Sequence, residues 1–434
     1  MPRRDRLRRR GRRRCPGRLR SGDRLRPAVG ALAALSLRRA IFWIHLAVGV
    51  AAAVVILMLA VTGVILTYEA QLNQWALRDY RADPPSPGVA PLGLDDLIAR
   101  VAGGTPAGPV TSAALHRDPL EPAVVGLDDG ATVYVDRFTG ERLGNGDTRT
   151  RRFLQNVMYW HRWFALDGEH RIIGRTVVAI ANLGFLFLLV SGVYLWWPST
   201  RSRAAWKHGL WFHPGLRGRA RDFNWHKVIG FWSVVPLVVI VFSGATISYQ
   251  WAADLVHRLA GDTPPFQQSP RPHSDARETP SVTPDPATSS PATPGVFARE
   301  LESITGRSSF AELQALAAKA GAETPGWRTL TIDLSESTHD PVVVTVDRGT
   351  GRQPSKREDL LFDRATGELV GRAGYPTFTR GFKIRRWLRF AHTGEVYGVV
   401  GQTIAGVVSL AVVVLVWTGL AMSWRRFFGR AGRT

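Results

Sequence analysis

Four long apolar stretches, separated by polar segments, dominate the pattern of the chain. They cover residues 40–68, 172–197, 225–250 and 396–424. A helix needs about 20 apolar residues to cross the hydrocarbon core of a bilayer. A water-soluble helix of this length would keep one polar face. The pattern therefore predicts an integral membrane protein with four transmembrane helices.

Positive charge gathers on one side of the predicted membrane segments. Two arginines precede the first helix, basic residues fill the connection at 198–224, and more follow the fourth helix at 425–434. Lys and Arg beside transmembrane helices are retained on the cytoplasmic side. We therefore expect both termini in the cytoplasm and the long polar segments, residues 69–171 and 251–395, outside.

Composition narrows the class of protein further. The chain has 434 residues, with 56 Lys and Arg against 35 Asp and Glu, a net charge of +21. Much of this charge follows the expected topology, so we expect membrane lipids as partners and no nucleic acid. Residues 1–37 are expected to form a basic, disordered tail drawn to lipid headgroups, with an export signal and a nucleic-acid tail as alternatives. The single cysteine, Cys15, excludes a disulfide framework, a cysteine-ligated iron–sulfur cluster and covalently attached haem.

The chain contains two internal repeats. Four residues of the first apolar stretch recur 181 positions later, and residues around the second stretch recur 227 positions later. The first set is His45, Gly49, Gly63 and Tyr68, repeated as His226, Gly230, Gly244 and Tyr249; the second includes Gly174, Thr176 and Gly192, repeated as Gly401, Thr403 and Gly419. Each repeat consists of a membrane helix, an outer domain and a second membrane helix.

The outer segments have the pattern of α+β domains. Residues 132–135 and 342–346 are predicted strands, and residues 298–320 a helix. The first outer domain is expected at residues 69–150 and the second at 251–380. Each is followed by an amphipathic segment, at 151–171 and 381–395. The two offsets differ by 46 residues, which indicates an insertion in the second outer segment. The Pro-rich stretch at 263–294 is predicted to be this insertion and to form a flexible linker.

Four of the 11 histidines stand near the ends of the apolar stretches. His45 and His226 are expected at the cytoplasmic end, and His161 and His392 at the outer end. Two neutral imidazoles facing each other in a helix bundle can ligate one haem iron, so the pattern predicts two b-type haems. His170, near the start of the second apolar stretch, is the alternative to His161 as a ligand. A hydrogen bond to a neighbouring helix is the other interpretation of each histidine, and no carboxylate or cysteine cluster indicates a non-haem metal.

Glycines and cations accompany the predicted ligands. Gly49, Gly230 and Gly394 would leave the turn beside each histidine free for a macrocycle, although close helix packing explains small residues equally well. Haem propionates need cations at the membrane surface. The candidates are Arg39 and Lys227 on the inner side and Arg162 and Arg389 on the outer side, with phospholipid binding as the alternative.

These motifs resemble those of the PepSY-associated transmembrane helix family of bacteria, also described as iron-regulated membrane proteins. The resemblance rests on a set of short motifs: His45 to Gly49, Thr62-Gly63, Tyr68-Glu69, Trp160 to Trp163, Ser191 to Pro198, His226 to Gly230, and Ala391 to Gly394. It implies a bacterial inner-membrane protein with one PepSY α+β domain in each half. Similarity to the ferric-siderophore reductases of the family implies two b haems and a ferric siderophore or another ferric chelate as substrate.

The expected function is electron transfer across the membrane to ferric iron on the periplasmic side. The chain has no Gly-rich nucleotide fingerprint after a strand, so the electron donor is expected to be a quinol or a cytoplasmic reductase. Two other functions remain open at this point. One is a PepSY-type sensor or protease regulator without redox catalysis, and the other is a component of a haem or iron permease.

Overall fold

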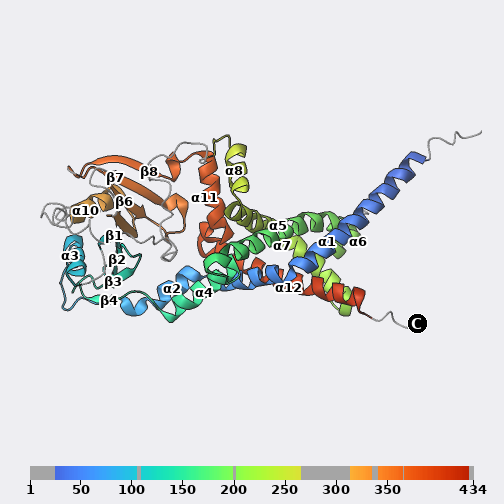
Figure 1. Ribbon diagram of the computed structural model, residues 1–434, viewed down its shortest axis with the longest axis horizontal. Helices are drawn as coiled ribbons and strands as arrows, with labels where there is room; N and C mark the ends of the chain where they lie inside the picture. The colour runs from blue at the N-terminus through green and yellow to red at the C-terminus, as the bar shows by residue number, and fades with distance from the viewer. Residues whose placement is uncertain are drawn as a thin grey trace, which may run out of the picture.

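The protein consists of a helical bundle and a β-sheet domain joined end to end (Figure 1). The computed structural model describes residues 25–104, 109–198, 202–264, 313–334, 341–364 and 366–429. All but the first two residues of the Pro-rich linker expected at 263–294 lie outside the described residues, as does the first part of the helix expected at 298–320.

Four long helices form the bundle. They are α1 (Leu25–Leu66), α5 (Arg171–Trp196), α7 (Gly218–Ser248) and α12 (Gly398–Phe427). Their apolar parts are long enough to cross a membrane, at Leu37–Leu66, Gly168–Trp196, Gly218–Ser248 and Glu395–Phe427. Apolar side chains such as Val54, Val235 and Val400 point away from the bundle and are at least 70% exposed. This outward apolar surface suits lipid, so the prediction of a multi-pass membrane protein is confirmed.

The bundle places α1 and α7 on one diagonal. Each of these helices packs against both α5 and α12. The shared core includes Ile56, Leu189, Leu237 and Val412, one from each helix. A side chain on α1 that points inward therefore faces α7 across the bundle axis.

Helix α1 begins earlier than the sequence suggested. Residues 1–37 were expected to be a disordered tail, yet α1 already includes Leu25 and continues without interruption to Leu66. The run from Ala28 to Leu37 is rich in Ala and Leu, which have high helix propensity. This run extends α1 beyond the rest of the bundle (Figure 1).

Short helices and turns surround the two ends of the bundle. We call the end next to the sheet the outer end and the opposite end the inner end. At the outer end lie α2 (Glu69–Ala76), α4 (Arg149–Trp163), α8 (Gln250–Leu259) and α11 (Arg380–His392), with the 3₁₀ turns η1 (Arg78–Tyr80), η2 (Gly168–His170), η4 (Pro354–Lys356), η5 (Tyr375–Thr377) and η6 (Glu395–Tyr397). At the other end, α6 (Arg203–Leu210) lies in the basic connection. The hydroxyls of Thr148 and Thr379 cap α4 and α11, which satisfies one free N–H group of each first turn.

One antiparallel sheet of eight strands forms the outer domain. The strand order is β4-β3-β2-β1-β5-β6-β7-β8. The strands are β1 (Val110–His116), β2 (Ala123–Leu127), β3 (Thr132–Val135), β4 (Arg142–Gly144), β5 (Thr329–Asp333), β6 (Val342–Asp347), β7 (Arg357–Phe362) and β8 (Leu369–Gly374). The two strands expected from the sequence, 132–135 and 342–346, are β3 and most of β6.

The two outer units are joined, whereas the sequence suggested separate domains. Each half contributes one helix, α3 (Leu94–Gly104) or α10 (Leu313–Glu323), followed by four strands. The halves meet where β1 pairs with β5, from Ser112 opposite Asp333 to His116 opposite Thr329. An edge strand of a separate four-stranded sheet would leave a row of backbone N–H and C=O groups unpaired. Pairing β1 with β5 satisfies both edges at once.

The two faces of the sheet differ in polarity. Side chains such as Leu97 of α3, Val125, Ile332, Val344 and Leu360 are fully buried in a core with α10. Alternate residues of the same strands, including Thr331 and Thr345, line the opposite face. The helices α3 and α10 lie on the side of the sheet away from the bundle (Figure 1). The polar face of the sheet is therefore turned toward the membrane.

Ile332 tests whether the two halves share one core. Ile332→Ala should lower the free energy of unfolding of the outer domain by about 2–5 kcal/mol, because it removes a fully buried side chain from the strand that joins the halves. Thr331→Ala, on the polar face of the same strand, should change it by less than about 1 kcal/mol. Hydrogen exchange should show faster exchange in both β1 and β6. Faster exchange confined to the second half would mean that the halves are independent domains.

Candidate functional site

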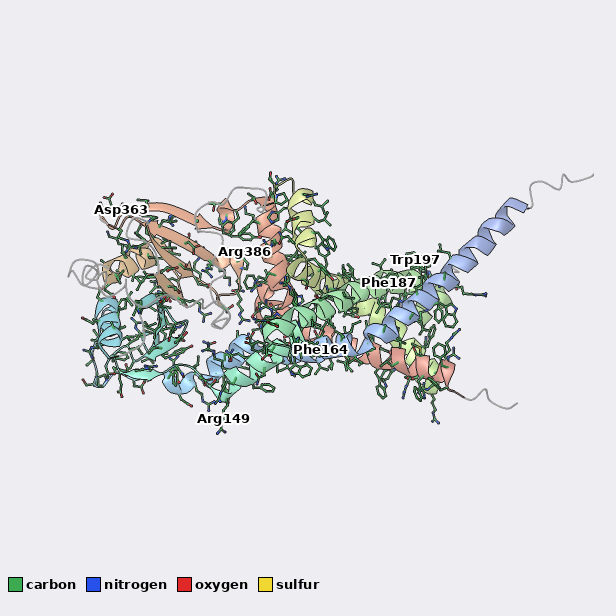
Figure 2. All side chains as sticks on the ribbon, in the orientation of Figure 1. Arg149, Phe164, Phe187, Trp197, Asp363 and Arg386 are labelled. Carbon is green, nitrogen blue, oxygen red and sulfur yellow. The ribbon has the colours of Figure 1, made fainter. Side chains whose placement is uncertain are left out.

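A cavity of about 2930 Å³ separates the polar face of the sheet from the outer end of the bundle. It continues between the four membrane-spanning helices, where Ile56, Phe185, Ile240 and Val412 line it. His161 and His392 also line the cavity. Phe164 ends α4 in a left-handed conformation, where α4 meets the bundle (Figure 2).

His161 and His392 approach each other across the cavity. His161 lies in the last turn of α4 and His392 at the end of α11, and their ring centroids are 6.3 Å apart with an interplanar angle of 68°. Metal–imidazole bonds are about 2 Å long, so two rings on opposite sides of one metal ion have centroids about 6 Å apart. The spacing therefore fits two axial ligands of one iron.

Hydrogen bonds fix the protonation of the outer histidines. The Nδ1 atom of His161 lies 2.8 Å from the Thr62 hydroxyl, which donates its own hydrogen to the Met58 carbonyl. The hydroxyl can then only accept, so His161 Nδ1 carries the ring hydrogen. His392 Nδ1 donates to the Ile240 carbonyl at 2.9 Å and lies 3.0 Å from the Ser243 hydroxyl. In both rings the Nε2 lone pair is left for a metal.

The inner histidines have hydrogen bonds of the same kind. His45 Nδ1 lies 2.8 Å from the Ser191 hydroxyl, which donates to the carbonyl four residues before it. His226 Nδ1 lies 3.0 Å from Thr418, whose hydroxyl also donates to the carbonyl four residues before it. His45 is on α1 and His226 on α7, so the two rings come from the diagonal pair of helices. The large cavity is not lined by either of them.

The four hydroxyls were missed by the sequence analysis, although the signal was present. Thr62 and Ser243 are 181 residues apart, and Ser191 and Thr418 are 227 residues apart. These are the two offsets that relate the halves of the chain. A search of the offsets for hydrogen-bonding partners, and not only for histidine and glycine, would have found them.

Burial keeps the outer imidazoles neutral. The pKa of His161 is lowered to about 3, mainly by desolvation and also by the neighbouring His392 and Arg162. Desolvation also lowers the pKa of His392, although its hydrogen bond to the Ile240 carbonyl opposes the shift. Only a neutral imidazole has a lone pair for iron, so both rings suit that task at neutral pH. His170, the alternative ligand, is exposed at the start of α5.

The glycines beside the predicted ligands differ in their surroundings. A Cβ atom at Gly49 or Gly230 would lie 3.7 or 3.8 Å from a leucine of the neighbouring helix, which is ordinary packing. Gly394 has a φ of 78° and lies against the Gly401 backbone, so it shapes the turn between α11 and α12. Gly63 of α1 and Gly244 of α7 are among the glycines that line the cavity.

Arginines surround the outer end of the cavity. Among the described residues, thirteen arginines and eight carboxylates line it. Arg162 and Arg389, expected from the sequence, are both present, and Arg386 lies on α11 between the sheet and the bundle (Figure 2). On the inner side Arg39 is exposed and Lys227 is half-buried, with its amine 5.7 Å from the Phe223 ring.

The inner end of the bundle also contains a buried carboxylate that the sequence analysis overlooked. Asp222, near the start of α7, is almost fully buried. It accepts hydrogen bonds from Arg221 at 2.9 Å and from Arg425 at the end of α12. These two arginines therefore neutralise a protein carboxylate and hold α7 against α12.

A second ionic cluster joins the sheet to the bundle. Arg352, in the connection from β6 to β7, lies 3.2 Å from a Glu69 oxygen and 2.9 Å from a Glu395 oxygen. Glu69 begins α2 just after α1, and Glu395 begins η6 just before α12. Burial alone would lower the pKa of Arg352, but the two carboxylates outweigh it and raise the pKa above its usual value. The guanidinium is thus held charged between the two domains.

Comparison with known proteins places the chain in a family. The family model described as the PepSY-associated TM region matches residues 42–426. The chain belongs to this family. The match spans both the four membrane helices and the sheet domain, so the family resemblance expected from the sequence is confirmed. A search of curated proteins finds no match.

Removing Arg352 should loosen the sheet domain of this PepSY-associated protein from its bundle. Arg352→Ala leaves Glu69 and Glu395 buried without their cation, which should cost on the order of 2 kcal/mol, less than the 3–5 kcal/mol of a fully buried pair. Arg348→Ala removes a more exposed ion pair at 3.7 Å and should cost less than about 1 kcal/mol. Thermal unfolding in detergent measures both. Equal losses would show that Arg352 is not the attachment point.

Proposed function

We propose that the protein is a dihaem b-type electron-transfer protein of the bacterial inner membrane. It reduces a ferric siderophore or another ferric chelate on the periplasmic side and releases ferrous iron. Both termini lie in the cytoplasm, and each half of the chain supplies one PepSY-like unit of the outer sheet. His45 and His226 hold the inner haem, and His161 and His392 the outer one.

The hydrogen-bonded state of the four histidines carries this proposal. Each ring has its Nδ1 atom on a hydroxyl of a neighbouring helix, so each presents Nε2 as a ligand. Second-shell partners of this kind orient ligating histidines in metalloproteins. A histidine that only joined two helices would need no free Nε2 atom. Four histidines with this hydrogen bond, arranged in two pairs, favour two metal centres over four separate helix contacts.

When bound, a haem with two histidine ligands supplies a one-electron carrier without an open coordination site. The chain's own residues then hold the carriers at two depths and keep the outer one beside the cavity. Each ferric ion takes one electron and becomes ferrous. A quinol or a cytoplasmic reductase is the electron source, and one quinol supplies two electrons for two ferric ions and releases two protons. Ferrous iron is bound less tightly by hard oxygen ligands, so the chelate releases it.

The cavity offers room and charge for a chelate. Its volume of about 2930 Å³ exceeds the roughly 300–1,000 Å³ of ordinary small-molecule sites. The arginines of α4, α5 and α11 face the sheet from the membrane side, where they can bind propionates or an anionic chelate. Thr331, Thr345 and Asp359 supply hydrogen-bonding groups from the sheet. The chelate therefore binds between the two domains, next to His161 and His392.

Loss of single ligands should remove single haems. We expect two b haems per chain in the purified protein, and about one after His161→Ala or His392→Ala, because each variant leaves the outer iron with one protein ligand. His45→Ala and His226→Ala should remove the other haem. The pyridine haemochrome assay counts the haems, and the reduced-minus-oxidised spectrum shows which band is lost.

His170→Ala is the matched control for these variants. His170 is exposed, so its loss should leave two haems and the rate of ferric-chelate reduction unchanged. A protein that binds no haem, or a His161→Ala variant that keeps two low-spin haems, would contradict the proposed ligand set.

Loss of one hydroxyl should change one haem only. Thr62→Val keeps the shape of the side chain but removes the acceptor for His161 Nδ1, so the ligand becomes less basic and the reduction potential of the outer haem should rise. The affinity for that haem should fall about tenfold, the lower end of the range for such partners, because the Leu59 carbonyl also contacts the ring. Ser191→Ala should shift the inner haem instead.

Thr62→Ser restores a hydroxyl at the same position and should restore the wild-type potential. A redox titration followed optically separates the two haems. If Thr62→Val shifted both haems equally, or neither, the hydrogen bond from His161 Nδ1 to Thr62 would not control the outer ligand.

A further inference from the structure

Helix α8 runs across the outer end of the bundle at the level where α7 leaves the membrane. The membrane-spanning part of α7 ends at Ser248, and α8 begins at Gln250. Figure 1 shows α8 beside α11, with both helices crosswise to the long axis of α7. The sequence analysis had assigned these residues to the outer α+β domain, but their place is against the membrane-spanning bundle.

The surface of α8 divides into three sectors. Successive residues are rotated by about 100° around a helix axis. One sector, with Ala252, Ala253, Val256 and His257, is buried. The second contains the exposed apolar residues Trp251, Leu255 and Leu259, which are 56%, 38% and 78% exposed. The third contains Gln250, Asp254 and Arg258, where the Gln250 amide donates to Asp254 at 2.9 Å.

Contacts with α11 fix the rotation of α8. The carboxylate of Asp262, just beyond α8, accepts a hydrogen bond from the Gly381 N–H at the start of α11. A Cβ atom at Gly381 would lie only 2.6 Å from the His257 ring, so the two helices touch at this point. The apolar sector of α8 therefore cannot turn inward while α8 stays on α11.

The position of the apolar sector indicates what covers it. It lies directly after Ser248, where the membrane-spanning part of α7 ends, and so at the boundary between the apolar helices and the outer domain. The first half of the chain has a similar arrangement, because α2 follows α1 directly, packs against α4, and exposes Leu72 and Trp75. Amphipathic helices with Trp and Leu on one side and polar residues on the other lie in the plane of the membrane interface.

We propose that α8 is an interfacial helix that inserts Trp251, Leu255 and Leu259 into the outer leaflet of the bilayer. The lipid contact holds α8 at a constant depth, and α8 in turn holds α11 at the membrane surface. This surface is independent of the haems, so the proposal does not depend on the redox function. Its partner is the acyl-chain region of the leaflet, with the polar sector directed to the headgroups and water.

Site-directed spin labelling tests this placement in the full-length protein. In a Cys15→Ser background, the variants Leu255→Cys, Leu259→Cys and Gln250→Cys each carry one nitroxide, and the protein is placed in phosphatidylcholine nanodiscs. Oxygen concentrates in the bilayer and the nickel–ethylenediaminediacetate complex stays in water. Labels at 255 and 259 should collide more often with oxygen than with nickel, and the label at 250, on the polar sector, should show the reverse order.

Each other result would overturn the proposal. Labels at 255 and 259 that collide mainly with nickel would place the sector in water. Labels that are shielded from both reagents would mean that protein covers the sector, either another part of the chain or a second copy. The same measurements in detergent micelles provide the comparison, because the labels at 255 and 259 should move toward the oxygen-rich pattern when lipid replaces detergent.

Discussion

The hydrogen bond between an imidazole Nδ1 atom and a hydroxyl on the next helix is the interaction on which the account of this protein depends. It occurs at His45, His161, His226 and His392, and each time it holds the ring in one tautomer. The bond also crosses from one helix to another. It therefore couples helix packing to the chemistry of the site, since a shift of either helix would turn the Nε2 atom away from the metal it is to bind.

The same constraint explains the architecture around the outer pair. His161 and His392 lie on α4 and α11, outside the membrane-spanning segments, and reach hydroxyls on α1 and α7. Both helices must therefore lie across the end of the bundle. The sheet then closes over them, because β1 pairs with β5 and Arg352 binds carboxylates beside α1 and α12. The result is a large cavity between the sheet and the bundle, with His161 and His392 among its lining residues.

Much of this arrangement follows from the sequence. Hydrophobicity predicts the four membrane helices, and the 181-residue offset pairs His45 with His226, whereas His161 and His392 are displaced by four residues from the 227-residue offset. The repeat offsets relate the four hydroxyls to one another, but they do not predict which hydroxyl meets which ring, because Thr62 and His161 are 99 residues apart and no local pattern relates them. Strands β1 and β5 are also far apart in the sequence. The residues of each strand suit either an edge or a central position in a sheet, so the sequence did not predict that the two strands pair. Helix α8 was missed because its ten residues directly follow the third apolar stretch and were assigned with the rest of 251–380 to the outer domain.

Electron paramagnetic resonance of the oxidised, full-length protein tests the central claim most directly. Iron with two imidazole ligands is low-spin, and the two pairs of histidines have different surroundings. The account predicts two low-spin ferric haem signals of equal intensity, one of which is lost in His392→Ala. A spectrum without low-spin haem, or with a high-spin signal that accounts for half of the iron in the wild-type protein, would contradict it.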